Sequence, residues 1–168
     1  VFQKENIAKI IQHFMLLEGA DKDPLSKKFY IFPRYHQLDV VSKLIDDVQT
    51  NGVGGTYLIQ HSAGSGKSNS ITWAAFQLIE LENTDGNPMF DSVIVVTDRR
   101  ILDKQLRDNI KSFSDIKNII GAAYSSNDLK LALEGGKRVI ITTIQKFPHI
   151  IDSVDEMSDK RFAVIIDE

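Results

Sequence analysis

The sequence contains no cysteine, and no stretch of it is long and apolar enough to cross a membrane. Without cysteine the chain has neither disulfide bonds nor thiolate metal ligands. A membrane helix needs roughly 20 consecutive apolar residues, and a secretory signal needs a basic segment followed by an apolar core; neither pattern occurs. We therefore expect a cytoplasmic protein without a membrane partner, whose chemistry depends on carboxylates, lysine, hydroxyls and a bound cation.

An excess of basic residues is also missing. The chain has 20 Lys and Arg against 23 Asp and Glu, which gives a formal net charge of -3 at pH 7. Because nucleic-acid-binding domains usually carry a basic surface, this balance counts mildly against DNA binding. Positive potential confined to one cleft would nevertheless suffice for a protein that grips a DNA backbone. The histidines His13, His36, His61 and His149 lack the spacing of metal ligands.

Two helices are predicted in the first third of the chain. Apolar residues recur at helical spacing over residues 5–18, and Gly19 supplies a stop. A polar connector then leads into a short extended segment at residues 29–32. Pro33 suits the first turn of a second helix, which is expected to end before Asn51. The main fold is therefore preceded by a short helical N-terminal segment.

Short β-branched and aliphatic runs alternate with helical patterns in the rest of the chain. The predicted strands cover residues 56–60, 92–97, 138–143 and 162–166, with a further short one at 118–123, and the predicted helices cover residues 68–82, 99–113 and 127–133. This alternation predicts an α/β fold with a mostly parallel sheet and helices on both faces. The polar loop at residues 82–91 is predicted to be disordered.

The loop His61-Ser-Ala-Gly-Ser-Gly-Lys-Ser68 lies between a predicted strand and a predicted helix. Its glycines allow backbone conformations that turn successive N–H groups inward, and the helix start adds its positive dipole end. Lysine can reach the β- and γ-phosphates of ATP, and the serine hydroxyl after it can ligate the bridging Mg²⁺. The predicted ATP site comprises Ser62, Ala63, Gly64, Ser65, Gly66, Lys67 and Ser68. His61 replaces the usual first glycine and is interpreted as structural; the alternative is a glycine-rich turn with a surface lysine.

Two carboxylates follow the last predicted strand. Asp167 and Glu168 come at its carboxyl end, which is where ligands bind in open parallel sheets. Asp167 is predicted to hold Mg²⁺ through its water shell, and Glu168 to orient or deprotonate the water that attacks the γ-phosphate. Taken alone, Asp-Glu after a strand is ordinary turn chemistry. The phosphate loop favours the catalytic interpretation.

Four further segments resemble the motifs of superfamily 2 helicases. Arg34-Tyr-His-Gln37 resembles the adenine-reading Q motif, residues 95–105 motif Ia, residues 141–147 motif Ib, and residues 165–168 the start of the DEAD/DEAH box. The resemblance implies adenine contacts from Gln37 with Arg34 beside it. It also implies contacts with the DNA backbone from Thr97, Arg99, Thr142, Thr143 and Gln145. Instead of contacting DNA, these residues could cap a helix, form a solvated charged face or be ordinary hydroxyls at strand ends.

Together these segments are similar to the motor part of the restriction (R) subunit of type I restriction endonucleases, where a histidine commonly opens the phosphate loop. The resemblance covers roughly residues 32–168. It implies a RecA-like P-loop fold that uses ATP and Mg²⁺ to translocate double-stranded DNA, in a complex with methylation (M) and specificity (S) subunits that cleaves DNA. Residues 1–31 would then be a helical linker or edge segment, and residues 32–168 the first RecA-like lobe, expected to be incomplete at its C-terminus.

Other functions remain as alternatives. One is another superfamily 2 helicase or repair translocase, and a second is a P-loop ATPase or kinase that does not act on nucleic acid. The third is a non-enzymatic interaction module. The sequence has neither the Asn-Lys-x-Asp motif of GTPases nor the Leu-Ser-Gly-Gly-Gln signature of transporter ATPases. Because a transition-state arginine from a second lobe typically supplies about 10³ to 10⁵ in rate, this chain alone is predicted to bind ATP with little or no turnover.

Overall fold

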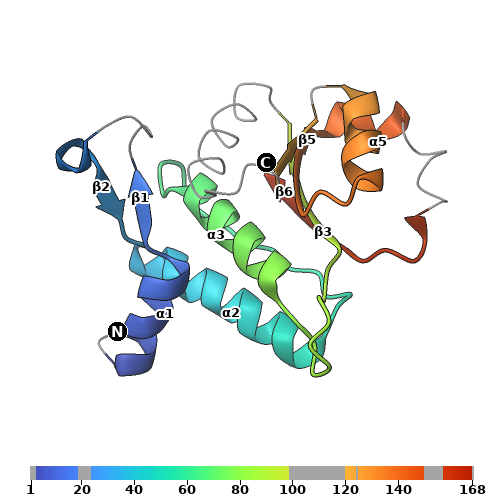
Figure 1. Ribbon diagram of the computed structural model, residues 1–168. Coiled ribbons are helices and arrows are strands. Elements are labelled where there is room, and N and C mark those ends of the chain that lie inside the picture. The colour runs from blue at the N-terminus through green and yellow to red at the C-terminus, as the bar shows by residue number, and fades with distance from the viewer. Residues whose placement is uncertain (1–2, 19–23, 99–119, 124, 150–156, 168) are drawn as a thin grey trace.

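The computed structural model describes residues 3–18, 24–98, 120–123, 125–149 and 157–167. A parallel four-stranded sheet lies between two helical layers, and a small N-terminal unit projects from one side (Figure 1). The strand order is β4-β5-β3-β6. The predicted α/β fold with helices on both faces of a parallel sheet is therefore confirmed. The helix predicted at residues 99–113 lies outside the described residues.

The central strand of the sheet is β3, Ser92–Thr97. It pairs in parallel with β5, Val139–Thr143, on one side and with β6, Phe162–Asp167, on the other. The short strand β4, Ile120–Ala122, extends the sheet beyond β5. Every residue of β3 and β5 is buried. This burial explains their nearly continuous apolar sequences, because a strand covered on both faces has no solvent side on which to place polar residues.

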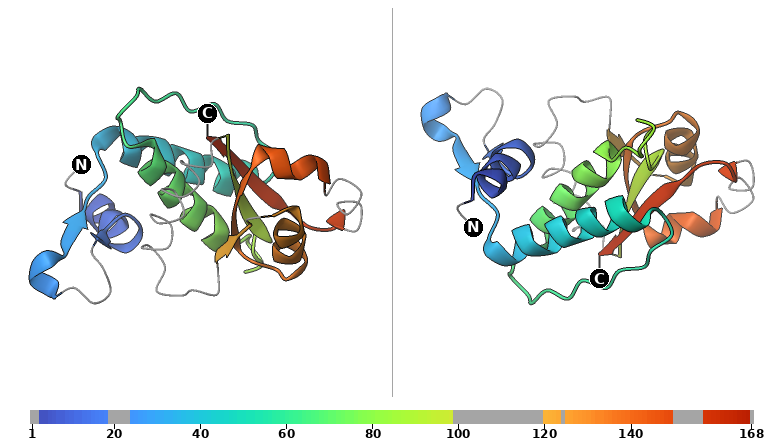
Figure 2. Two further views of the ribbon diagram at one scale, coloured as in Figure 1. Left: turned by 90° about the horizontal axis from the view of Figure 1, so that it is seen from above. Right: turned by 90° about the horizontal axis from the view of Figure 1, so that it is seen from below.

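Within the described part of the chain, helices lie on both faces of the sheet, as the views from above and below show (Figure 2). The first face carries α2, Tyr35–Asn51, and α3, Lys67–Glu80. The second carries α5, Ser126–Glu134, together with the 3-10 helix η2, Ile144–His149. Alternate residues of β3 serve the two cores: Val93 and Val95 pack in the first, Ile94 and Val96 in the second.

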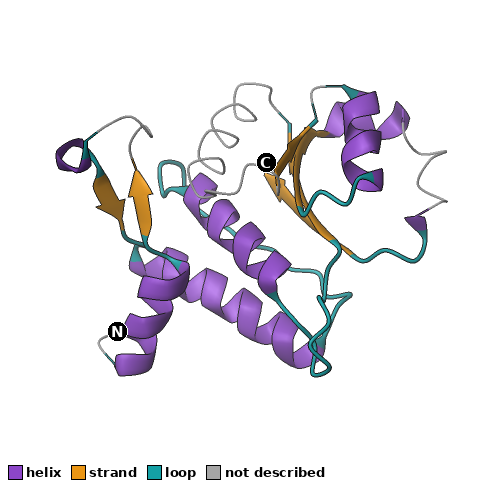
Figure 3. Ribbon diagram, viewed as in Figure 1, coloured by secondary structure: helices purple, strands orange, loops and turns teal. Residues whose placement is uncertain are grey.

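The N-terminal unit consists of a helix and an antiparallel hairpin (Figure 3). Helix α1 covers Lys4–His13, and strand β1, Leu16–Glu18, pairs with β2, Phe29–Ile31; the short 3-10 helix η1, Leu25–Lys27, lies between them. The prediction of one helix over residues 5–18 was therefore wrong at its C-terminal end. The backbone of β1 finds its hydrogen-bond partners in a segment more than ten residues away, and helical periodicity does not detect such a partner.

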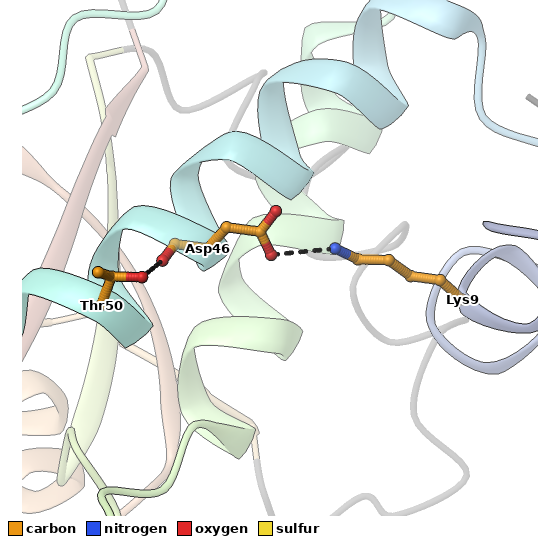
Figure 4. Close-up of polar contacts among 3 residues, drawn as sticks. All are labelled: Lys9, Asp46 and Thr50. Carbon is orange, nitrogen blue, oxygen red and sulfur yellow. Dashed lines mark hydrogen bonds and ion pairs between the residues drawn. The ribbon is translucent and has the colours of Figure 1, made fainter. Parts of the chain in front are cut away.

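Helix α1 is attached to the main fold mainly by an aromatic side chain. Phe14, directly after α1, is fully buried, and its ring lies 5.6 Å from the ring of Trp73 on α3. Lys9 of α1 also forms an ion pair of 3.3 Å with Asp46 of α2, whose backbone carbonyl accepts a bond from Thr50 (Figure 4). An ion pair this exposed contributes at most about 1 kcal/mol, whereas burying a phenylalanine contributes about 1.5–3 kcal/mol. The predicted boundary between a linker or edge segment at residues 1–31 and a RecA-like lobe at residues 32–168 stays a prediction.

The strand predicted at residues 56–60 is not formed. This segment has no regular secondary structure and no strand partner, and the side chain of Leu58 is 97% exposed. Tyr57 fixes the segment instead, because its hydroxyl donates a 2.7 Å hydrogen bond to the carboxylate of Asp47 on α2. A β-prone sequence becomes a strand only where its backbone pairs with another strand. Within the described part of the chain, β6 pairs only with β3.

The loop at residues 82–91 is ordered, contrary to the prediction. The side-chain carbonyl of Asn83 accepts hydrogen bonds from the N–H groups of Asp85 and Asn87, which closes a compact turn. Met89 and Phe90 are buried in the first core. The polar composition of the turn concealed these two apolar anchors, which hold it against the fold. Among the described residues, no helix is long and apolar enough to span a membrane.

Candidate nucleotide-binding site

The phosphate loop leads directly into α3. Gly64 and Gly66 both adopt positive φ angles, of 73° and 83°, which L side chains rarely accept. Gly66 precedes Lys67, the first residue of the helix, so the lysine sits where the unsatisfied N–H groups of α3 gather. Ser65 donates its N–H to the carbonyl of Ser62 at 3.3 Å, which closes the loop as a turn. Glycines in this conformation before a helix start are typical of loops whose backbone N–H groups bind an anion.

The residues present fit a triphosphate with a magnesium ion. A Cβ atom built on Gly64 would meet no atom within 4 Å, so the loop is open at this point. The hydroxyl of Ser65 and Nδ1 of His61 are buried and have no hydrogen-bond partner among the described residues. Buried polar atoms without partners are rare in proteins and indicate a site completed by a ligand or by water. Lys67 and Ser68 supply the cation and the hydroxyl that such a ligand requires.

The first turn of α2 lies against the phosphate loop. Gln37 is only 2% exposed, and its Nε2 donates to the carbonyls of Gly66 at 3.0 Å and of Ser65 at 3.3 Å. Its Oε1 accepts a 2.8 Å hydrogen bond from the backbone N–H of Arg34. Arg34 itself is exposed to solvent. His36 Nε2 lies 3.1 Å from the Ser65 carbonyl. Gln37 therefore joins the start of α2 to the start of α3. Adenine contacts from Gln37 and Arg34 stay predictions.

The two histidines of this region contact each other. The rings of His36 and His61 meet edge to face with their centroids 5.3 Å apart. Burial, and then the neighbouring charges of His36 and Lys67, lower the pKa of His61 below its ordinary value. His61 is therefore neutral at physiological pH and adds no positive charge beside Lys67. His36 was not predicted as a site residue, although its position directly before Gln37 is the signal that could have suggested it.

The carboxyl ends of the strands meet at one edge of the sheet. Thr97, at the end of β3, lies opposite Asp167 of β6 on one side and Thr143 of β5 on the other. Parallel pairing thus brings the predicted magnesium ligand to the same edge as the ends of the other strands. The first turn of α3 and the end of β6 lie at the same end of the molecule (Figure 1). Glu168 lies outside the described residues.

The residues predicted to contact DNA fall into three groups. Thr97, Thr142 and Thr143 are buried, with exposed fractions of 0%, 0% and 3%. Gln145 is exposed, and its amide donates to the backbone carbonyl of Asp98 at 3.3 Å. Arg99 lies outside the described residues. The three hydroxyls thus lie beneath the surface in this structure, and DNA contacts from these positions stay predictions.

The chain is similar in sequence to a family of ATPases and to two known proteins. Residues 36–168 match the SWI2/SNF2 ATPase family. The chain is 31% identical over 159 residues to the type I restriction enzyme HindI endonuclease subunit of Haemophilus influenzae, covering 88% of this chain and 14% of that protein. It is 30% identical over 118 residues to the C-terminal part of the putative type I restriction enzyme MpnIIP endonuclease subunit of Mycoplasma pneumoniae, covering 66% of this chain and 53% of that protein.

The chain thus spans 14% and 53% of the lengths of these two relatives. The predicted similarity to type I restriction subunits is confirmed, and so is the RecA-like type of fold. The family match begins at His36 and includes the phosphate loop, β3, β5 and β6. Because the match covers most of its length, the chain belongs to the SWI2/SNF2 ATPase family.

Proposed function

We propose that the chain is the ATP-binding motor lobe of an ATP-dependent double-stranded DNA translocase, within the R subunit of a type I restriction endonuclease. One observation supports this proposal more than any other. The left-handed Gly66 opens α3 with Lys67 and Ser68, at the end of the molecule where β6 presents Asp167. A phosphate cradle opposite a carboxylate at a strand end is the arrangement that phosphoryl transfer requires.

Each residue of the site has a distinct task in this proposal. Lys67 holds the β- and γ-phosphates, and the hydroxyl of Ser68 ligates Mg²⁺. Asp167 holds the ion through its water shell, and Glu168 orients or deprotonates the attacking water. Bound MgATP supplies the phosphoanhydride bond that is hydrolysed. His61 is neutral and adds no charge of its own to the loop.

Double-stranded DNA and the M and S subunits are the proposed partners of the whole protein. Two relatives are named as endonuclease subunits of type I restriction enzymes, which supports DNA as the substrate. The motif resemblance of residues 95–105 and 141–147 supports translocation along it. The carboxyl ends of β3 and β5, which belong to these segments, lie side by side. This chain alone is proposed to bind ATP with little turnover.

Removal of the Lys67 ammonium tests the nucleotide site. In Lys67→Ala we expect ATP affinity, measured by calorimetric titration with Mg²⁺, to fall about 10- to 100-fold, because a charge-assisted hydrogen bond is lost. Lys43→Ala is the matched control, since Lys43 is an exposed lysine on α2 paired with Asp39. Equal ATP affinity in both variants would overturn the assignment of the loop.

Stimulation by DNA tests the motor function. The full-length protein is expected to hydrolyse ATP faster when double-stranded DNA is added. An unchanged rate, in a preparation that binds ATP normally, would favour a P-loop enzyme that does not act on nucleic acid.

A further inference from the structure

The central strand of the sheet ends in a buried hydroxyl group. We infer that Thr97, the last residue of β3, is a positioning residue whose hydroxyl holds the carboxylate of Asp167 in the orientation that Mg²⁺ requires. This inference rests on the proposed function, in which Asp167 holds the ion. It gives Thr97 a task toward the nucleotide, whereas the motif resemblance implies only a contact with DNA.

Burial makes the hydroxyl of Thr97 costly. The residue is 0% exposed, and its Oγ1 has no hydrogen-bond partner among the described residues. The four preceding residues of the strand, 93–96, are all valine or isoleucine, so the surroundings favour an apolar side chain. Valine has nearly the same shape as threonine and would avoid the cost of a buried, unpartnered hydroxyl. A buried polar atom of this kind needs a partner that arrives with a ligand, with water or with a rearranged side chain.

The sheet places Thr97 and Asp167 on the same face. Successive side chains of a strand point to opposite faces, so Thr97 shares the face of Val95, and Asp167 shares the face of Ile165. Val95 lies in the first core, between the sheet and α2 and α3, and Ile165 packs against it. Helix α3 contacts both strands and begins with Lys67. Both polar side chains therefore face the helix that carries the phosphate-binding residues.

Thr97 and Asp167 are also direct neighbours across the sheet. They occupy paired positions of β3 and β6, and adjacent strands lie about 4.8 Å apart. The other neighbour of Thr97 is Thr143 on β5. Of these two neighbours only Asp167 offers a carboxylate, and hydrogen bonds to a charged acceptor are roughly twice as strong as those to a neutral one. A rotation of the two short side chains gives Thr97 Oγ1 the acceptor that it lacks.

A carboxylate that holds Mg²⁺ through water needs a fixed orientation. Carboxylates at metal sites are themselves held by hydrogen bonds, and the loss of such a bond costs about 10- to 100-fold in metal affinity. Asp167 has two oxygen atoms, so one can accept from Thr97 while the other accepts from water bound to the ion. Within the described part of the chain β6 pairs with β3 alone, so no other strand end restrains this carboxylate.

Thr97→Val tests the inference because it removes the hydroxyl and keeps the shape. Without ligand, we expect the variant to melt about 2–4 °C above the wild type, since the buried hydroxyl without a partner is gone. ATP affinity in the presence of Mg²⁺, measured by calorimetric titration, should fall about tenfold, whereas ATP affinity in EDTA should not change. Thr97→Ser keeps the hydroxyl and should retain the full gain in ATP affinity from Mg²⁺. A merely structural threonine would not combine higher stability with a smaller effect of Mg²⁺.

Ser92 supplies the matched control at the other end of β3. It is also buried, with an exposed fraction of 1%, but its hydroxyl donates a 2.8 Å hydrogen bond to the carbonyl of Lys137. Ser92→Ala should therefore lower the melting temperature and leave the effect of Mg²⁺ on ATP affinity unchanged. The two variants on one strand should shift the melting temperature in opposite directions.

Asp167→Asn separates a failure of this inference from a failure of the proposed function. If Asp167→Asn loses the gain in ATP affinity from Mg²⁺ while Thr97→Val keeps it, the role of Thr97 is refuted. A lower melting temperature of Thr97→Val would refute it as well, because the hydroxyl would then be structural. If Asp167→Asn itself keeps the full gain, the proposed function loses its magnesium ligand. We expect the double variant to lose no more than Asp167→Asn alone.

Discussion

Substitution of Gly66 by alanine tests how tightly the phosphate loop is fitted. The change adds one methyl group at a residue with φ of 83°. An L residue in the left-handed region is destabilised by roughly 1–2 kcal/mol relative to glycine. The new Cβ would also lie 2.5 Å from Gln37 Nε2, so the amide has to move away from the carbonyls that it holds.

The expected magnitude follows from these two effects. Each of the two displaced hydrogen bonds contributes about 1 kcal/mol, so strain and displacement together amount to about 3–4 kcal/mol. If the loop relaxes by abandoning its phosphate-binding shape, ATP affinity falls by about 100-fold or more. Truncation of Gln37 to alanine in the same chain removes the clash. The loss in the double variant should therefore be smaller than the sum of the two single losses.

Gly52 supplies the control for backbone strain alone. It ends α2 with φ of 82°, and a Cβ atom there would meet no atom within 4 Å. Because its ψ of -166° places it in a region that is essentially restricted to glycine, Gly52→Ala should lower the free energy of unfolding by about 1–3 kcal/mol and leave ATP affinity unchanged. Calorimetric titration with MgATP and chemical denaturation measure the two quantities. Wild-type ATP affinity in Gly66→Ala, with the same stability loss as Gly52→Ala, would refute the argument.

Two further predictions concern stability. Phe14→Ala should lower the free energy of unfolding by about 3–5 kcal/mol, because Phe14 is fully buried. Ile11 is 59% exposed, so Ile11→Ala should change the free energy of unfolding little. Equal losses of the two variants in chemical denaturation would contradict this prediction. Burial, His36 and Lys67 lower the pKa of His61 below its ordinary value of 6.5. The stability that neutral His61 contributes is therefore fully present above pH 6.5, and it is lost as the pH falls through the lowered pKa. His61→Phe should flatten that acid dependence in thermal unfolding, and an NMR titration of His61 at or above pH 6.5 would contradict it.

Local patterns predicted the elements whose environment is uniform along their length. The run Ser92–Thr97 became a strand because both of its faces are buried, and residues 127–133 became helical with Ser125 as the side-chain cap. Prediction failed where a distant partner decides the structure. Leu16–Glu18 pairs with Phe29–Ile31 instead of continuing the predicted helix, and residues 56–60 have strand character but pair with no described strand, although β6 has a neighbour on one side only.

In the candidate site, too, the residues with a local pattern could be predicted and those that depend on a distant partner could not. Gly64, Gly66 and Lys67 could be found from the sequence because a phosphate nest is built from consecutive residues, and each one has a local chemical reason. The contacts of His36 could not be predicted from the sequence, because they depend on how α2 packs beside the loop. Its partner is also the backbone carbonyl of Ser65, and a carbonyl group has no sequence signature.

The chain contains a single tryptophan, and its location has a practical consequence. Trp73 lies in the second turn of α3, the helix that leaves the phosphate loop, and its ring contacts Phe14 from the N-terminal unit. All indole fluorescence of the protein therefore originates from one buried ring at this junction. Detachment of α1 would expose that ring to water and shift its emission to longer wavelength. The attachment of the N-terminal unit can thus be followed without any added label.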